Sequence, residues 1–409
     1  MLSVEEQQAV VLAAAGTTED ETVAIPDAAG RTLRAPLTAR VDIPVFDNSA
    51  MDGFAVRYED VAAASPENPV PLTVVADLPA GSGLDPELGP GQAARIMTGS
   101  AAPTGADAIV PFEDTAAGLA DSLGEITVLI APRPGAHIRR RGEDLRTGDV
   151  VVPAGVLLTP LQLSAAAAAG VTHAVVARRP RVAVVSTGAE LVPPGRPLRR
   201  GQIPESNGEL LAGLVRDAGA ELVLRTTVDD TDAAFLAALE RARAAGAEIV
   251  VTSGGVSEGA FEVVRGALAG SDVSFVKVAM QPGKPQGFGR LDFGALLFGL
   301  PGNPVSSGVS FEVFVRPVIL RMLGRTGIHR PLLRLPAAVA WKTPPIRRQY
   351  LPAAIDRSDP GRWTVRPATA GGSGSHLAGG LAHAEAYAVV PGEIDRVEAG
   401  DLVDVMLVS

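Results

Sequence analysis

The 409-residue sequence predicts an α/β multidomain protein with a doubly wound central domain. A chain of this length is expected to form roughly two to four domains. Strand-like and helix-like segments alternate regularly from residue 181 to 324, which is typical of a parallel sheet covered by helices on both faces. Short strand-like runs between Gly and Pro turns fill residues 44–133 and 330–409, so β-rich units are expected beside that domain.

The N-terminal segment predicts a helix that begins after Ser3 and runs to about Ala15. Ser3 and Glu6 have the spacing of a capping box, in which each side chain bonds the other residue's backbone N–H. A second helix-compatible segment surrounds the alanine run 164–170, and we expect it to pack against the first helix. The predicted helical linker domain consists of residues 1–45 and 134–179.

An inserted β domain is predicted over residues 46–133. Its expected strands are 72–77, 108–113 and 126–130. The runs are short and bounded by turn residues, so we expect a small sheet with its own core.

The central α/β domain is predicted over residues 180–327. Leu210, Leu211 and Leu214 recur at helical spacing between two apolar runs. The expected strands are 181–186, 221–228, 248–253 and 274–280, and the expected helices are 208–219, 235–246 and 261–270. Short strands return over residues 328–409, which predicts a C-terminal β barrel or sandwich.

Composition excludes several classes of function. The net charge of -10 and the pI near 5.1 argue against a nucleic-acid partner or an anionic membrane surface. The chain has no Cys, which excludes disulfides, thiolate nucleophiles and Cys-ligated metals, and its five His show no metal-like or triad-like spacing. The acidic start and the lack of an apolar run of about 18 residues predict a cytoplasmic protein without membrane insertion.

The segment 296–307, LLFGLPGNPVSS, is the strongest indication of a binding site. An apolar strand runs into a Gly/Pro turn and then a helix, whose first N–H groups are suited to an anion. Segments 181–191, 248–259 and 275–289 also end an apolar run in small or hydroxyl residues, and such strand ends meet at one sheet edge. Each could also be an ordinary connection. A nucleotide- or sugar-phosphate enzyme is disfavoured because neither GxGxxG nor GxxxxGK[ST] occurs at a strand-to-helix point.

These segments, taken in order, resemble a known family. The matching runs are FDNSAMDGFAVR, RIMTGSAAPTGADAIVPFED, HIRRRGEDL, STGAEL, IPESNGELL, TSGGVSEG, KVAMQPGKP and GLPGNPVSS. The chain is similar to the molybdopterin molybdenumtransferases of the MoeA and gephyrin E-domain family over essentially its full length. One run alone is weak, whereas the ordered set is specific.

The resemblance implies a MogA-like central domain, the inserted β domain, the helical linker, the C-terminal β barrel, and a homodimer. The active site would form between the α/β domain of one subunit and the linker and β domains of the other. The implied reaction inserts molybdate into adenylylated molybdopterin and releases AMP, with Mg²⁺ as the divalent cation. A molybdopterin adenylyltransferase is a candidate partner that delivers the intermediate.

The resemblance also implies site residues. Asp52, Thr98, Glu190, Asp229 and Glu262 take catalytic roles, the last three also as metal ligands and the first two across the dimer. For the acidic residues after the strands, the alternative is a carboxylate that simply favours a helix N-terminus. The implied substrate contacts are Thr252, Ser253, Gly254 and Gly255 for phosphate and pterin, Ser186, Thr187 and Gly188 as a neighbouring wall, Ser206 and Asn207 as caps or contacts, and Lys277, Lys284, Pro285, Pro301 and Pro304 around molybdate.

Three departures from the family pattern bear on activity. Glu262 and Val263 stand where Asp and Tyr are common, Gln281 replaces a cation, and Pro352 replaces an arginine. Because a charge-assisted hydrogen bond contributes about 1.5–3 kcal/mol, losing two would weaken molybdate binding unless Arg347 or Arg348 compensates. The alternative hypothesis is therefore a gephyrin-like scaffold that clusters protein partners and has weakened transferase activity.

Overall fold

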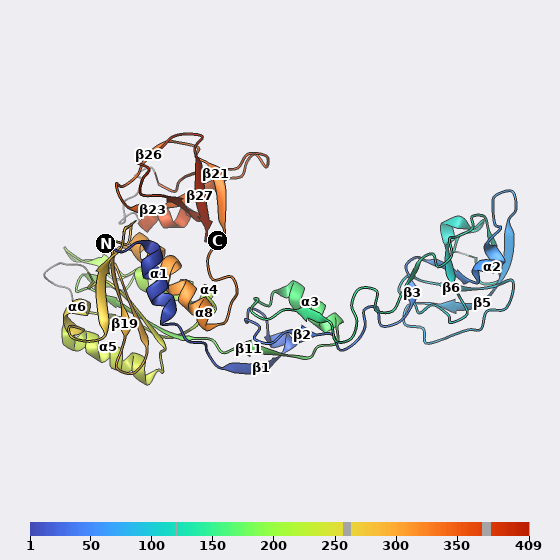
Figure 1. Cartoon of the computed structure of the whole chain (residues 1–409), viewed down its shortest axis with the longest axis horizontal. Coiled ribbons are helices and arrows are strands. Elements are labelled where there is room, and N and C mark those ends of the chain that lie inside the picture. Colours follow the sequence, from blue (N-terminus) through green and yellow to red (C-terminus); the bar gives the residue numbers. More distant parts are fainter. Residues whose placement is uncertain (120, 257–262, 370–377, 409) are drawn as a thin grey trace.

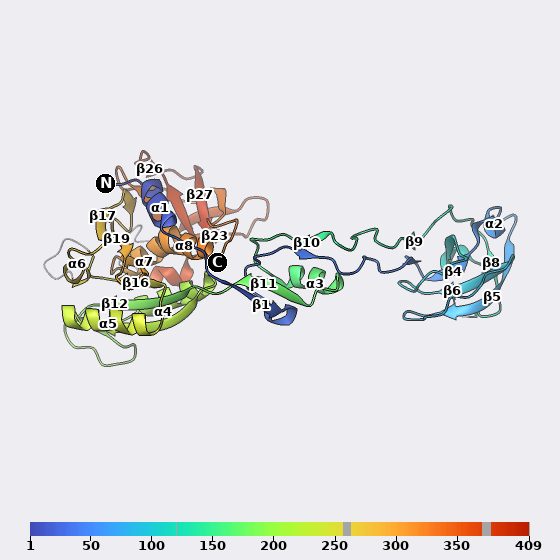
Figure 2. The ribbon, with the colours of Figure 1, turned by 60° about the horizontal axis from the view of Figure 1, so that its bottom comes forward.

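The computed structural model describes residues 1–119, 121–256, 263–369 and 378–408. The molecule is elongated, with a small β domain at one end, a linker in the middle and the α/β and C-terminal domains at the other end (Figure 1). The second view shows the same separation (Figure 2). Among the helices described, none is both long and apolar enough to span a membrane.

The linker is built from two chain segments that pair with each other. Strand β1 pairs antiparallel with β11, and β2 pairs antiparallel with β10. Leu33 from the first segment and Leu158 and Ala166 from the second are fully buried in one core. The elements are β1 (Asp20–Ala24), η1 (Ile25–Asp27), β2 (Leu37–Thr38), β10 (Val150–Val152), α3 (Pro160–Ala168) and β11 (His173–Ala177).

Helix α1 (Val4–Ala13) has the predicted capping box between Ser3 and Glu6. The expected packing of the alanine-rich segment against this helix is wrong. Val4 and Val11 of α1 are buried in the core of the α/β domain, whereas Ala166 of α3 belongs to the linker core. Figure 1 accordingly shows α1 beside α8 and far from α3.

Polar contacts join the two chain segments that connect the linker to the β domain. Within these segments, β3 (Asn48–Ser49) pairs with β9 (Ile138–Arg139). The Thr147 backbone N–H and hydroxyl each donate to Asp42 Oδ1 over 2.8 Å, and Arg141 Nε donates to Oδ2 over 2.6 Å. The Thr147 backbone bond, its hydroxyl bond and then Arg141 lower the pKa of Asp42 to about 2.

This shift predicts a pH-dependent contribution to stability. The folded pKa of Asp42 lies below its ordinary value of 3.8, so its bonds stabilise the fold above about pH 4 and are lost as the pH falls towards 2. The melting temperature of Asp42→Asn should therefore lie below that of the parent at pH 7, with the difference vanishing near pH 2. Thermal unfolding by circular dichroism would measure it. A difference that stays constant from pH 7 to pH 2 would contradict this prediction.

The inserted β domain forms one five-stranded sheet in the order β7-β4-β6-β5-β8. The three predicted strands are confirmed as β5, β7 and β8. Phe54, Leu72 and Ile126 fill the core on one face. The elements are β4 (Gly53–Val56), α2 (Tyr58–Val61), β5 (Val70–Leu78), β6 (Gln92–Ile96), β7 (Ala108–Pro111), η2 (Phe112–Asp114) and β8 (Glu125–Val128).

The α/β domain contains a six-stranded sheet in the order β15-β12-β16-β20-β19-β17. The first four strands are parallel, as predicted, but β19 runs antiparallel to both of its neighbours, β20 and β17. The expectation of a wholly parallel sheet is wrong because β17, β19 and β20 follow each other through turns with no crossover helix. The strands are β12 (Arg181–Thr187), β13 (Leu191–Val192), β14 (Ile203–Pro204), β15 (Glu221–Val228), β16 (Ile249–Ser253), β17 (Val273–Lys277), β19 (Pro285–Arg290) and β20 (Leu296–Leu300).

Helices cover both faces of this sheet. Neighbouring residues of a strand point to opposite faces, so each strand contributes buried side chains to the core on both sides. Val184 and Val251 pack with Leu211 of α4 on one face, and Val185 and Phe235 of α5 pack on the other. The helices are α4 (Asn207–Asp217), α5 (Asp232–Ala244), α6 (Val263–Ala267), α7 (Pro304–Ser310) and α8 (Arg316–Met322), with the π-helical segment η3 (Phe311–Val315) joining the last two.

The C-terminal domain is a β structure whose main sheet has the order β18-β23-β25-β27-β21, with β24 on β23. Strand β18 comes from the α/β part of the chain, so the predicted single strand 274–280 is split between two sheets. The elements are β18 (Met280–Gln281), β21 (Leu332–Pro336), β22 (Trp341–Lys342), β23 (Arg348–Asp356), β24 (Thr364–Pro367), η4 (Ala378–His383), β25 (Ala386–Val390), β26 (Arg396–Val397) and β27 (Leu402–Leu407).

Candidate functional site

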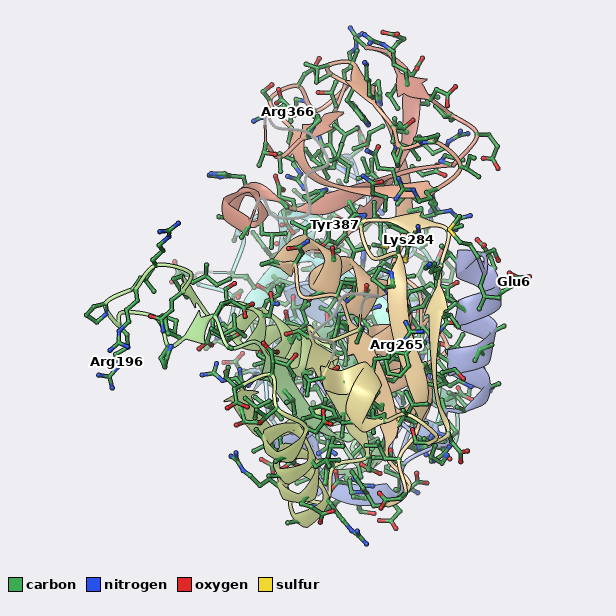
Figure 3. The ribbon with its side chains drawn as sticks, turned by 90° about the vertical axis from the view of Figure 1, so that its left-hand side faces the viewer. Glu6, Arg196, Arg265, Lys284, Arg366 and Tyr387 are labelled. Carbon is green, nitrogen blue, oxygen red and sulfur yellow. The ribbon has the colours of Figure 1, made fainter. Side chains whose placement is uncertain are left out.

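A cavity of about 940 Å³ lies at the carboxyl ends of the parallel strands, against the C-terminal domain. Ligands of doubly wound sheets bind at this edge. Figure 3 shows Lys284 where the strands of the α/β domain meet the C-terminal domain. The predicted residues that line the cavity are Thr187, Gly188, Glu190, Ser206, Asn207, Ser253, Gly254, Gly255, Lys284, Pro285, Pro301 and Pro304.

Two glycines form the wall after β16. Gly254 has φ +97° and Gly255 has φ +68°, a region that side chains disfavour. A Cβ on Gly254 would lie 2.7 Å from the Thr187 carbonyl oxygen. The Gly254 N–H donates to Leu300 O over 3.0 Å, which links this turn to the end of β20. Glycine is therefore needed for close contact between the loops.

This contact predicts a strong effect of Gly254→Ala. The left-handed backbone costs about 1–3 kcal/mol for alanine, and the Cβ also pushes Thr187 away. Thermal unfolding should show lower stability, and ligand binding in the cavity should fall further. Gly294→Ala is the matched control, since Gly294 has φ +90° but no atom within 4 Å of its Cβ position. Equal effects of the two substitutions on ligand binding would count against a role in the cavity wall.

The turn after β20 forms the opposite wall. Asn207 Nδ2 donates to Gly302 O over 2.6 Å, and the Ser307 hydroxyl donates to Pro301 O over 2.5 Å. The helix predicted after this turn is confirmed as α7, which begins at Pro304. The buried Asn207 Oδ1 has no hydrogen-bond partner among the described residues, so it is available to a ligand. Asn207 both holds the turn and offers an acceptor to the cavity.

The hydroxyls of Ser186 and Thr252 lie behind the wall. Both residues are fully buried and neither lines the cavity. The Ser186 hydroxyl donates to Glu205 Oε1 over 2.9 Å, and the Gly208 N–H donates to the same oxygen over 2.7 Å. Thr252 Oγ1 is buried without a partner among the residues described. Sequence reasoning did not identify Glu205, although a carboxylate just before the predicted helix was a usable signal.

The acidic side of the cavity differs from the expectation. Glu190 and Asp230 line it, and the Ala189 N–H donates to Asp230 Oδ2 over 2.9 Å. Asp229 does not line the cavity. Its Oδ1 accepts from the Thr231 N–H and hydroxyl over 3.2 and 2.6 Å, beside the start of α5. The structure thus places Asp229 in the helix-terminal role and its neighbour at the cavity.

Glu262, the third predicted carboxylate, lies outside the described residues. Within the described ranges, no group of three His, Cys, Asp or Glu side chains is arranged to hold a metal ion. The carboxylates of Glu190 and Asp230 are hard oxygen donors of the kind that Mg²⁺ prefers. These two residues fit a cation that also takes oxygen ligands from a bound substrate.

The positive side of the cavity consists of Lys284 and Arg347. Arg347 comes from the segment that leads into β23, and neither side chain has an ion pair with another described residue. Arg348 instead pairs with Glu5 of α1 over 2.6 Å. Lys277 is exposed and does not line the cavity. Of the two candidate compensating arginines, only Arg347 therefore reaches the site.

The structure also shows where two other departures from the family pattern, Gln281 and Pro352, lie relative to the cavity. Gln281 lines the cavity beside Met280 and Lys284. Pro352 lies within β23 opposite Tyr387 and is not part of the lining. Arg347 thus supplies a positive charge from the domain in which the expected arginine is missing.

Asp52 and Thr98 lie together, but far from this cavity. The Thr98 N–H and hydroxyl donate to Asp52 Oδ1 over 2.7 and 2.8 Å. These bonds, the backbone one first, hold the pKa of Asp52 below its usual value, so the carboxylate stays ionised. Both residues belong to the β domain at the opposite end of the molecule (Figure 1). A single copy of the chain does not bring them to the cavity.

Family models match nearly the whole chain. The MoeA N-terminal region (domain I and II) matches residues 2–170, a probable molybdopterin binding domain matches residues 183–321, and the MoeA C-terminal region (domain IV) matches residues 334–408. Molybdopterin molybdenumtransferase 2 of Mycobacterium tuberculosis is 44% identical over 407 residues, 98% of each chain. Molybdopterin molybdenumtransferase of Haemophilus influenzae is 34% identical over 401 residues, 95% of this chain and 94% of that one.

Solved structures agree with these matches. A molybdopterin biosynthesis MoeA protein from Pyrococcus horikoshii OT3 has a TM-score of 0.83 at 27% identity and covers 100% of both chains. A second structure of a MoeA protein from Pyrococcus horikosii has a TM-score of 0.78 at 31% identity, covering 100% of this chain and 99% of that one. The predicted fold class and family are confirmed. The chain belongs to the MoeA family of molybdopterin molybdenumtransferases.

Proposed function

We propose that this protein inserts molybdate into adenylylated molybdopterin and releases AMP, the last step that makes molybdenum cofactor. Membership of the family supports a transferase role in molybdenum cofactor biosynthesis. The observation that supports this specific reaction is that both cationic and acidic side chains line the cavity. Lys284 and Arg347 are suited to an oxyanion, and Glu190 and Asp230 are suited to a cation on a phosphate.

Each wall of the cavity has a role in this reaction. The turns at Gly254 and Gly302 bring backbone N–H groups close to the phosphates, and Asn207 Oδ1 can accept from the pterin. Lys284 and Arg347 hold molybdate near the dithiolene sulfurs until it is transferred. A Mg²⁺ ion held by Glu190 and Asp230 would neutralise charge on the phosphates as AMP leaves.

The test is release of AMP from purified molybdopterin-AMP by this protein with Mg²⁺ and a titration of molybdate. Release that depends on both molybdate and Mg²⁺ is expected. The same titration with chelated metal distinguishes Mg²⁺ dependence from spontaneous hydrolysis. No release at millimolar molybdate, from protein that binds the adenylylated pterin, would favour the scaffold hypothesis instead. No described feature of the structure supports the scaffold better than the transferase.

We also propose that the working unit is a homodimer. Asp52 and Thr98 are too far from the cavity of their own chain to act there, whereas a second copy could place them at it (Figures 1 and 2). Apolar side chains exposed on the linker support an interface there. Leu161 of α3 is 79% exposed and Val150 of β10 is 55% exposed, and both lie at or beside a small cavity of about 230 Å³. Burial of such side chains favours association.

Leu161→Asp is therefore expected to weaken the dimer. A charge placed in an apolar interface loses its hydration, so the dimer dissociation constant should rise by at least about tenfold. Sedimentation equilibrium would measure it. Leu236→Asp is the control, at a leucine of α5 that is 45% exposed, and should leave the constant unchanged. If both variants remain as dimeric as the parent, α3 is not at the interface.

The reaction is proposed to occur in the cytoplasm. The absence of Cys is compatible with a reducing compartment. A molybdopterin adenylyltransferase remains the candidate partner for delivery of the intermediate.

A further inference from the structure

A positively charged loop projects from the rim of the cavity. Residues 193–202 join β13 to β14, and Leu191 and Ile203 at its two ends line the cavity. The loop contains Arg196, Arg199 and Arg200 and no acidic residue. All three arginines are exposed, and within the described part of the chain none has an ion pair. Figure 3 shows Arg196 pointing away from the body of the domain.

The β domain carries the opposite charge. Residues 46–133 contain 13 Asp and Glu against three Arg and no Lys, a formal net charge of -10. This equals the net charge of the whole chain, so the rest of the molecule is neutral overall. The acidity of the protein is thus a local property of the domain that holds Asp52 and Thr98.

The topology gathers part of this negative charge at the edge that carries Asp52. Asp52 precedes β4, and Gly53 pairs with Ile96 of β6 and Pro111 of β7. Glu113 belongs to η2, which follows β7, and the Phe112 N–H of η2 donates to Asp52 O over 3.2 Å, so Glu113 lies at the same edge. We define the acidic edge as Asp52, Glu113 and Asp114.

Within one chain the acidic edge and the arginine loop cannot meet. The linker lies between the two domains in both views (Figures 1 and 2). Glu113 is exposed and, like the loop arginines, has no ion pair with another described residue. Each surface thus lacks an opposite charge in its own copy, and a second copy carries the complement of both.

We propose that the acidic edge of one copy's β domain docks on the arginine loop of a second copy. This inference rests on the proposed dimer and names the contact that brings Asp52 and Thr98 to the partner's cavity. Opposite charges across such a contact steer association and fix its orientation. The contact is therefore sensitive to salt, since charges further apart than about 8 Å are screened at physiological ionic strength.

Disulfide trapping tests the contact without reference to activity. The chain has no Cys, so a disulfide in the double variant R199C/E113C can form only between the introduced residues. Their separation in one chain requires the bond to join two copies, and oxidation should give a covalent dimer on a denaturing gel. Adding R196E and R200E to this variant should slow cross-linking about tenfold.

The variant R199C/E67C is the matched control. Glu67 is also exposed and acidic, but it precedes β5 at the opposite edge of the same sheet. Cross-linking of R199C/E113C well above this control is expected, and equal or absent cross-linking overturns the proposed contact. AMP release by the parent is measured separately. Release without specific cross-linking would reject only the contact, whereas cross-linking without release would reject only the transferase activity.

Discussion

Lys284→Ala is expected to lower the efficiency of molybdate-dependent AMP release by about 10- to 100-fold. Lys284 lines the cavity and has no ion pair with another described residue, so its charge is available to an oxyanion. A charge-assisted hydrogen bond contributes about 1.5–3 kcal/mol, which corresponds to that range. The loss should appear mainly as a higher KM for molybdate. Initial rates of AMP release over a molybdate titration would measure it.

Lys277→Ala is the matched control. Lys277 precedes Lys284 in the same segment but is exposed and outside the cavity. Its replacement should leave the KM for molybdate within about twofold of the parent, because exposed charges contribute little. If Lys277→Ala has the larger effect, molybdate does not bind in the cavity as proposed. Arg347→Ala should behave like Lys284→Ala, and Arg348→Ala should not.

Asp52→Ala is expected to abolish AMP release while leaving the cavity intact. Asp52 is ionised and fixed by two hydrogen bonds from Thr98, yet it belongs to the β domain, which lies far from the cavity of its own chain. In a dimer it would act in the partner's site. An equal mixture of Asp52→Ala and Lys284→Ala chains should then recover about a quarter of the parent activity, because half of the dimers are mixed and each has one complete site.

Glu67→Ala is the control for the β domain. Glu67 carries the same type of charge at the edge of the sheet away from Asp52. Its single variant should keep parent activity. Recovery in the mixture must also require subunit exchange, so activity should rise with the fraction of mixed dimers. No recovery after exchange has been verified would show that Asp52 does not act across the dimer.

Much of the fold was predictable because local patterns determine the elements. The capping box at Ser3 starts α1, and β15 has the predicted bounds Glu221–Val228. The expected turn at Gly302 leads from β20 into α7. These features depend on residues close in sequence, so their physical cause could be read there. The domain boundaries proposed from composition remain a prediction.

Pairing between segments that are distant in the chain was harder to predict from the sequence. The sequence predicted one strand over 274–280, but its first four residues lie in β17 and its last, Met280, lies in β18, which pairs with the C-terminal domain. The antiparallel direction of β19 depends on the turns that join it to β17 and β20. The position of α1 depends on which core accepts Val4 and Val11. Each outcome is determined by partners distant in the chain.

The sequence by itself determined the family, the alternation of strands and helices, and the strand ends that form the cavity. Only the tertiary structure decided between neighbouring residues of the same type. Asp230 rather than Asp229 lines the cavity, and Arg347 rather than Arg348 does so. Adjacent side chains in an extended segment point in opposite directions. A one-residue difference in register, set by contacts from other elements, therefore decides which of them meets the ligand.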